Sequence, residues 1–174
     1  MDYFTKKNIS IYIFFGSQTG YSKSVAYELN KKIINKVRPM NINIDIDILN
    51  NFFNYNINKD DFTIILLSTT GDGEFPDNSN KIFKSLRKNK PRLDNINYCL
   101  LGFGDSNYNS FCHSSKVLDR LLKKNHATKF IETEFNDESL NSNEIINNWM
   151  EKVILYLQNY RNTLFEWFVN SMSG

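Results

Sequence analysis

Short, largely apolar runs alternate along this chain with segments of helical periodicity. The runs at 9–15, 62–67 and 96–101 are rich in β-branched, aromatic and leucine residues. A strand of that composition is typically buried on both faces, as in a parallel sheet. Parallel strands are joined by right-handed helical crossovers, which place helices on both faces of the sheet. The sequence therefore predicts an α/β fold with a doubly wound parallel sheet.

The remaining elements complete this alternation. At 42–48, isoleucine alternates with Asn and Asp, which predicts a strand with one dry and one wet face at a sheet edge. A fifth strand is predicted at 128–133, and a short helix is possible near Asn51. Apolar residues at helical spacing predict helices at 21–37, 79–88, 114–124 and from 143 onward.

Length and composition limit the classes of protein to consider. A chain of 174 residues is expected to form one domain, with its core at about 9–158 and a helical extension or linker at 159–174. The net charge of +2 is too small to indicate nucleic acid or an anionic membrane as partner. No apolar run reaches membrane-spanning length, and we expect the first residues not to be a signal peptide. Two cysteines argue against a disulfide framework or a zinc site, which favours a cytoplasmic location.

Three loops after predicted strands are rich in Gly, Ser and Thr, at 16–22, 68–78 and 102–110. In open parallel sheets the ligand lies beyond the carboxyl ends of the strands. The first loop, Ser17–Ser22, joins a strand to a helix, so its backbone N–H groups and the positive end of the helix converge on one point. We expect an anion there, most simply a phosphate.

Three well-known phosphate sites do not fit this first loop. Gly16 and Gly20 enclose three other residues, so the dinucleotide pattern G-x-G-x-x-G is absent. Tyr21 and Ser22 come after Gly20, so the Lys-Ser/Thr pair of a Walker loop is also absent. The acidic residues of a phospho-accepting receiver domain are missing after the first and third strands. The loop therefore indicates a phosphate held by uncharged groups, without metal and without transfer.

Taken together, the three loops resemble a known family. GSQTG at 16–20, STTGDGEFPDN at 68–78 and LGFGDSNY at 101–108 are similar to motifs in the flavin mononucleotide (FMN) domain of diflavin reductases. This family includes cytochrome P450 reductase, methionine synthase reductase and the reductase of cytosolic iron–sulfur assembly. The resemblance spans about 9–149 and implies a flavodoxin-like, five-stranded sheet of order 2-1-3-4-5.

The resemblance also implies a role for individual residues. The FMN phosphate would be held by Ser17, Gln18, Thr19, Gly20, Tyr21 and Ser22. One side of the isoalloxazine ring would be lined by Ser68, Thr69, Thr70, Gly71 and Gly73. The other side would be lined by Leu101, Gly102, Phe103, Tyr108, Phe111 and Cys112, with Tyr108 stacked on the ring. Asp137 would reach the ribityl chain.

Two positions depart from the family pattern. Many relatives carry an aromatic residue where Thr70 stands, and a threonine cannot stack on a flavin. Either Phe75 covers that face of the ring, or the face is open to a partner. The segment 134–137 lacks the glycines that usually surround the acidic residue, so Asp137 matches the family by its carboxylate alone.

The function implied by the resemblance is electron transfer. The chain would receive electrons from an FAD/NADPH reductase domain, in the same or a separate chain, and pass them singly to a haem, cobalamin or iron–sulfur protein. No residue is expected to act as acid, base or nucleophile, because the flavin supplies the chemistry. Two alternatives stay open: a freestanding flavodoxin with separate partners, and a flavodoxin-fold scaffold without redox activity.

Overall fold

The computed structural model describes residues 9–37 and 42–172, without the side chains of residues 165, 167–169 and 171–172. The strands are β1 (Ile9–Gly16), β2 (Ile42–Ile48), β3 (Phe62–Ser68), β4 (Asn97–Gly104), β5 (Thr128–Lys129) and β6 (Glu134–Asp137). The α-helices are α1 (Tyr21–Lys36), α2 (Asn80–Lys88), α3 (His113–Lys124) and α4 (Glu144–Met172). Three short 3-10 segments are η2 (Leu49–Asn54), η3 (Asp77–Ser79) and η4 (Glu138–Leu140).

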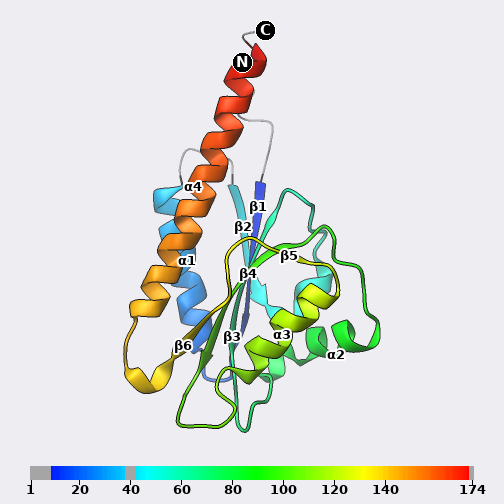
Figure 1. The fold of residues 1–174 in the computed structure, drawn as a ribbon, viewed down its shortest axis with the longest axis vertical. Helices are drawn as coiled ribbons and strands as arrows, with labels where there is room; N and C mark the ends of the chain where they lie inside the picture. The colour runs from blue at the N-terminus through cyan, green and yellow to red at the C-terminus, as the bar shows by residue number, and fades with distance from the viewer. Residues whose placement is uncertain (1–8, 38–41, 173–174) are drawn as a thin grey trace.

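The strands form one parallel sheet with helices on both faces. Its order is β2-β1-β3-β4-β5. The first residues of β4 pair with β5, and its last residues pair with β6. Figure 1 shows α1 and α4 on one side of the sheet and α2 and α3 on the other. The predicted fold class and strand order are therefore confirmed.

Each face of the sheet carries its own hydrophobic core, because successive side chains of a strand point to opposite faces. Ile11 and Ile13 of β1 pack with α1 and α4, where Trp149 is fully buried. Tyr12 and Phe14 of the same strand pack with α2 and α3. Burial on both faces explains why β1 and β3 contain so few polar residues.

Strand β2 lies at the sheet edge, as predicted. Asn43 and Asp45 are exposed between half-buried isoleucines. The alternation in the sequence thus reflects one face against α1 and one face in solvent.

The predicted fifth strand at 128–133 is wrong in its extent. The strand pairing stops at Lys129, and a second short strand, β6, resumes it at Glu134. At the break, Phe130 and Ile131 pack against the core beneath α1 and α4. Thr133 instead donates a hydrogen bond to Asp119 of α3, on the opposite face. These contacts on opposite faces bend the chain out of the strand.

The fourth strand is longer than predicted. The sequence pattern predicts a strand at 96–101 and a loop at 102–110, but β4 continues to Gly104 and pairs with β6 there. Gly102 allows this, because a Cβ at Gly102 would lie 2.7 Å from Cβ of Ser115 in α3. The loop thus begins at Asp105.

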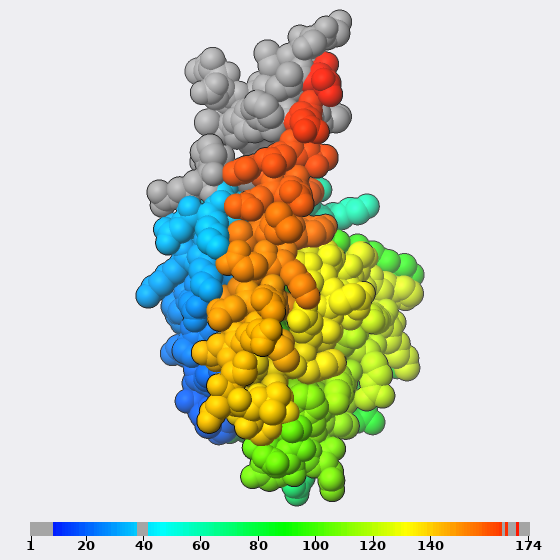
Figure 2. Space-filling model, turned by 60° about the vertical axis from the view of Figure 1, so that its left-hand side comes forward, coloured from blue at the N-terminus to red at the C-terminus, as the bar shows by residue number. Residues whose placement is uncertain are grey.

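Helix α4 extends beyond the end of α1. Gln158 donates a hydrogen bond to the last carbonyl of α1, at Lys36, and Lys36 also pairs with Glu151 at 2.6 Å. The remaining 14 residues of α4, from 159 to 172, therefore continue for about 21 Å past that contact. Figure 2 shows α4 lying along α1 before it continues upward. Within the described residues, no helix has the length and apolar character needed to cross a bilayer.

Candidate functional site

The carboxyl ends of β1, β3 and β4 lie side by side, and the segments just after them form the candidate site. Hydrogen bonds connect these three segments directly. Ser17 N–H donates to Asn78 Oδ1 at 2.9 Å, and Thr69 N–H donates to the carbonyl of Phe103 at 3.0 Å. Ser110 Oγ donates to the carbonyl of Asp72 at 2.9 Å. The structure thus brings together the three loops singled out in the sequence.

The loop after β1 leaves several N–H groups available to a ligand. Gly20 is the N-cap of α1 with a left-handed φ of 93°, and no described side chain caps the helix. Ser17 Oγ accepts the Gly20 N–H at 2.8 Å. The N–H groups of Gln18, Thr19 and Tyr21 have no acceptor among the described residues. A helix N-terminus with free donors and no acidic residue in its first turn fits an anion.

The side chains of this loop serve different purposes. Ser22 is buried, and its Oγ donates to the carbonyl of Gly16 at 2.8 Å, so it fixes the turn from inside. The amide of Gln18 bonds Asp77 at 3.4 Å. Thr19 is exposed and has no partner among the described residues. An anion would therefore meet backbone N–H groups, the hydroxyl of Thr19 and the O–H of Ser17.

The loop after β3 is a tight turn that depends on two glycines. Thr70 and Glu74 form an isolated antiparallel bridge, with Glu74 N–H donating to the Thr70 carbonyl at 2.7 Å. Gly71 and Gly73 lie within it at φ 48° and 105°, values that favour glycine. A Cβ at Gly73 would also lie 2.9 Å from Cβ of Ser110. At the start of this loop, Ser68 is buried, whereas Thr69 and Thr70 are partly exposed.

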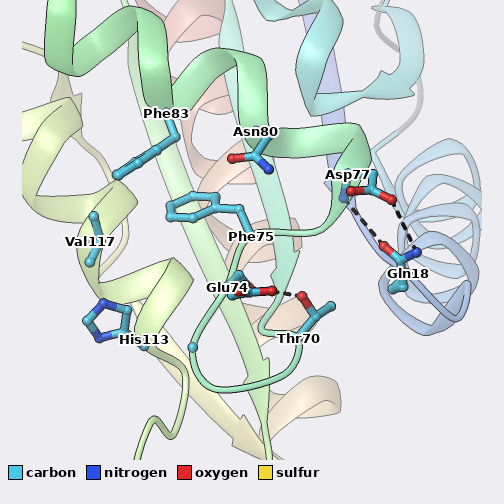
Figure 3. Close-up of a pocket in the computed structure, with 10 residues that line it drawn as sticks. Gln18, Thr70, Glu74, Phe75, Asp77, Asn80, Phe83, His113 and Val117 are labelled. Atoms are coloured by element: carbon cyan, nitrogen blue, oxygen red, sulfur yellow. Dashed lines mark hydrogen bonds between the residues drawn. The ribbon is translucent and has the colours of Figure 1, made fainter.

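Phe75, the aromatic residue that could cover a flavin at Thr70, packs against α2 in this structure. It is 9% exposed and stacks on Phe83 of α2, with ring centroids 4.4 Å apart. In Figure 3 the two rings line one side of a pocket of about 600 Å³, together with Val117 and His113. None of its lining residues comes from 101–112, so this pocket lies beside the meeting point of the three loops. An open ring face at Thr70 stays a prediction.

The loop after β4 presents one exposed aromatic ring. Tyr108 is 62% exposed, although most large apolar side chains of the chain are buried. Phe111 is half-buried beneath Lys116, whose Nζ lies 5.0 Å from the ring centroid. Cys112 is buried with φ 51°, and burial raises the pKa of its thiol to about 12. Tyr108 is thus available for stacking, and Cys112 is a packing residue.

Leu101, Gly102 and Phe103 lie beneath this loop, not beside it. All three are buried within β4, and the side chains of Leu101 and Phe103 belong to the core under α1 and α4. The ring of Tyr21 packs edge-on against Phe103 at 5.5 Å. These residues form the floor of the site, and their contact with a ligand stays a prediction.

Asp137 connects the end of β6 to the loop that carries Tyr108. Its Oδ1 accepts the N–H groups of Ser106 and Ser139, each at 3.0 Å, and the Ser139 hydroxyl at 2.7 Å. Hydrogen bonding from Ser106 and Ser139 lowers the pKa of Asp137 to about 2. Burial raises the pKa of neighbouring Glu138, and the charges of Asp105 and Asp137 raise it further. The rim of the site on this side is therefore acidic.

Asp137→Ala is expected to speed hydrogen exchange at the Ser106 amide by about tenfold, because the amide loses its charge-assisted hydrogen bond to the carboxylate. Native-state exchange measured by NMR at neutral pH tests this directly. Asp137→Asn keeps an acceptor oxygen and serves as the matched control, with a smaller expected change. Unaltered exchange in Asp137→Ala would show that the loop is held by other contacts.

Sequence reasoning gave no role to two residues that shape the site. Gly104 ends β4, where a Cβ would lie 2.7 Å from the backbone nitrogen of Cys112. Asn78 bonds the first loop from a distance of 61 residues in the chain. Both stand within the quoted motifs, but only the three-dimensional structure shows what they contact.

Comparison with known proteins agrees with this geometry. The flavodoxin family, described as "Flavodoxin", matches residues 13–149, which include all three loops and Asp137. The NADPH sulfite reductase flavoprotein alpha-component of Aliivibrio fischeri is 37% identical over 121 residues, 69% of this chain and 19% of that protein. Methionine synthase reductase of Caenorhabditis elegans is 31% identical, over 80% of this chain and 20% of that protein. The chain thus spans about a fifth of the length of these relatives.

Solved structures support the same fold. A flavodoxin of Pseudomonas aeruginosa, solved as a cysteine-to-alanine mutant, superposes with a TM-score of 0.68 at 19% identity, covering 86% of this chain and 99% of that one. A flavodoxin of Streptococcus pneumonia superposes with a TM-score of 0.61 at 24% identity, covering 86% and 95%. The resemblance to FMN domains of diflavin reductases is confirmed. The chain belongs to the flavodoxin family, whose cofactor is FMN.

Proposed function

We propose that this chain binds FMN and transfers electrons as the FMN domain of an NADPH-dependent diflavin reductase. The observation that carries the proposal is the uncapped N-terminus of α1, whose free N–H groups share one edge of the sheet with the exposed ring of Tyr108. The first feature suits a phosphate, and the second suits a flat aromatic ring. The chain from 9 to 158 would form the single domain that holds them.

The residues present fit FMN in charge as well as in shape. Lys23 is the one cation within or next to the first loop, and the N–H groups of Gln18, Thr19 and Tyr21 supply uncharged donors for a phosphate. Bound FMN supplies the redox chemistry, and the protein supplies binding, orientation and electrostatics. The open face at Thr70 gives an electron acceptor a route to the ring.

Basic and acidic side chains are concentrated in different segments of this chain, although its net charge is only +2. Residues 81–92, which include most of α2, contain six Lys or Arg and no acidic residue. The loops of the site instead carry a set of carboxylates: Asp72, Glu74, Asp77, Asp105, Asp137 and Glu138. Complementary charge guides encounter and orientation. We infer that haem, cobalamin or iron–sulfur acceptors dock at this acidic edge through a basic surface, and that an FAD/NADPH module supplies the electrons.

Tyr108→Ala is expected to weaken FMN binding by about 2- to 12-fold, since aromatic stacking contributes roughly 0.5–1.5 kcal/mol beyond area burial. Quenching of flavin fluorescence on titration measures the affinity. Tyr108→Phe keeps the ring and is the matched control, with near wild-type affinity expected. Unchanged affinity and quenching in Tyr108→Ala would remove Tyr108 from the site.

An electron-transfer assay separates the proposal from a scaffold without redox activity. The FMN-loaded protein is reduced chemically without oxygen and mixed in a stopped-flow instrument with cytochrome c, a basic haem protein. We expect rapid haem reduction that slows as salt is added, because salt screens attraction between the two surfaces. A protein that binds no FMN supports the scaffold alternative. Transfer that is independent of salt would contradict docking at the acidic edge.

A further inference from the structure

Asn78 connects two loops of the candidate site that are distant in the chain. Its Oδ1 accepts the Ser17 N–H at 2.9 Å across 61 residues. Ser17 is the first residue after β1, and its Oγ in turn accepts the Gly20 N–H at 2.8 Å. Asn78 thus fixes the position of Ser17, and Ser17 in turn fixes the turn into α1. Any role of Asn78 toward a ligand rests on the proposed binding of FMN.

Hydrogen bonds from Asn50 hold the backbone next to Asn78 in place. Asn50 of η2 donates from Nδ2 to the carbonyl of Asp77 at 2.8 Å, and its Oδ1 accepts the Lys81 N–H at 2.7 Å. The backbone on both sides of Asn78 is therefore anchored to a different part of the fold. Asp77 also bonds Gln18, accepting at its carboxylate and donating from its backbone N–H (Figure 3). A short segment anchored on two sides can hold the first loop in one position.

The close approach of η3 to the end of β1 explains why Asn78 can reach Ser17. A Cβ at Gly16 would lie 2.8 Å from Cβ of Ser79 and 2.5 Å from Cδ1 of Leu67. Gly16 therefore lets the two segments touch, and Ser79 is fully buried at their contact. The distance between Asn78 and Ser17 is set by this packing and does not depend on a mobile surface side chain.

The hydrogen bonds divide the N–H groups of the loop into two sets. Those of Ser17 and Gly20 are bonded within the protein, at the two ends of the loop. Those of Gln18 and Thr19, between them, have no acceptor among the described residues. Fixing the ends while leaving the middle free aims the free donors at one point, which lowers the cost of ordering the loop around a ligand.

We propose that Asn78 is a positioning residue for the FMN phosphate: it shapes the cradle through Ser17 without touching the ligand. The role is specific to the phosphate, because the side chain of Asn78 bonds the first loop and makes no hydrogen bond to residues 105–112 in the part of the chain that the structure describes. Loss of its side chain would misplace the free N–H groups and leave the stacking surface in place. FMN and riboflavin, which differ only by the phosphate, therefore respond differently.

Calorimetric titration of the wild-type and Asn78→Ala proteins with FMN and with riboflavin tests this. We expect Asn78→Ala to weaken FMN binding by about tenfold and riboflavin binding by less than about twofold. A tenfold loss of affinity equals about 1.4 kcal/mol of binding free energy, which is the net contribution of about one hydrogen bond. Asn80→Ala, a nearby asparagine whose side chain has no described hydrogen bond, is the matched control and should change neither. Ser17→Ala combined with Asn78→Ala should give less than the product of the two single effects, because both act on one loop.

The possible outcomes distinguish the two proposals. A wild-type protein that binds neither flavin, or binds both equally, contradicts the proposed function itself. A wild-type preference for FMN that persists unchanged in Asn78→Ala overturns only the role of Asn78. Equal losses for FMN and riboflavin in Asn78→Ala also overturn it, since they indicate a general structural role.

Discussion

Asp119→Ala is expected to lower the free energy of unfolding by about 3 kcal/mol, because it leaves a buried cation without its main partner. Asp119 accepts hydrogen bonds from Lys129 at 3.1 Å, Tyr98 at 2.9 Å and Thr133 at 2.7 Å. The Lys129 side chain is only 8% exposed and the Asp119 side chain 14%. The other carboxylate partner of Lys129 is Glu132, which lies 3.4 Å from Lys129 Nζ and has a side chain that is 89% exposed. Urea denaturation of the wild-type and Asp119→Ala proteins measures the difference in their free energies of unfolding.

Lys123→Ala provides the control for this prediction. Lys123 also pairs with Asp119, at 3.3 Å, but its side chain is 52% exposed. We expect it to cost less than about 0.5 kcal/mol, as surface ion pairs usually do. Equal losses in Asp119→Ala and Lys123→Ala would contradict the account of a buried network that holds the break between β5 and β6.

The same network predicts a dependence of stability on pH. Burial alone would raise the pKa of Asp119, but hydrogen bonds from Lys129, Thr133 and Tyr98 outweigh burial and lower it. A carboxyl with a lowered pKa stabilises the fold fully above its unfolded value of about 3.9 and loses that contribution as pH falls through the folded value. The stability difference between wild type and Asp119→Ala should therefore shrink in acid. A constant difference between about pH 7 and about pH 2 would contradict it.

Gly104→Ala is expected to destabilise the fold by about 2 kcal/mol, since overpacking a filled site typically costs roughly 1–3 kcal/mol. The added Cβ would lie 2.7 Å from the backbone nitrogen and 3.0 Å from Sγ of Cys112. Backbone cannot move aside as a flexible side chain does, so the segment from Asp105 to Cys112 must shift and carry Tyr108 with it. We therefore expect FMN affinity to fall by about tenfold or more, because misplaced contact groups lose both stacking and orientation.

Asn107→Ala is the matched control, because Asn107 lies in the same loop, is exposed and bonds Asp105 through its backbone alone. It should leave both stability and FMN affinity near the wild-type values. Thermal unfolding and flavin titration of the two variants give both quantities. Wild-type affinity in Gly104→Ala would show that the position of this loop does not govern binding.

Much of the fold could be predicted because its signals are local. The apolar runs of β1 and β3 reflect burial on both faces, and the alternation in β2 reflects an edge strand with one wet face. The three loops of the site were found for the same reason: glycine and hydroxyl residues cluster within short segments at strand ends. Local composition was enough to identify these elements.

The errors arose where distant contacts decide the local structure. The break after Lys129 depends on the hydrogen bond from Thr133 to Asp119 of α3 and on the packing of Phe130 in the core. The segment 128–133 alone has the pattern of one strand. The extension of β4 to Gly104 depends on pairing with β6, a strand that was not predicted. The role of Asn78 depends on a contact 61 residues away. No periodicity within a single segment carries this information.

We propose that the free N–H groups after β1 hold the phosphate of a flavin. Calorimetric titration of the wild-type protein with FMN, with riboflavin in parallel, tests it most directly. We expect one FMN per chain and an affinity for FMN about 100-fold or more above that for riboflavin, because riboflavin lacks the phosphate that would accept charge-assisted hydrogen bonds at the helix N-terminus. Equal affinity for the two flavins, or no binding of FMN, would rule out a phosphate site at these N–H groups.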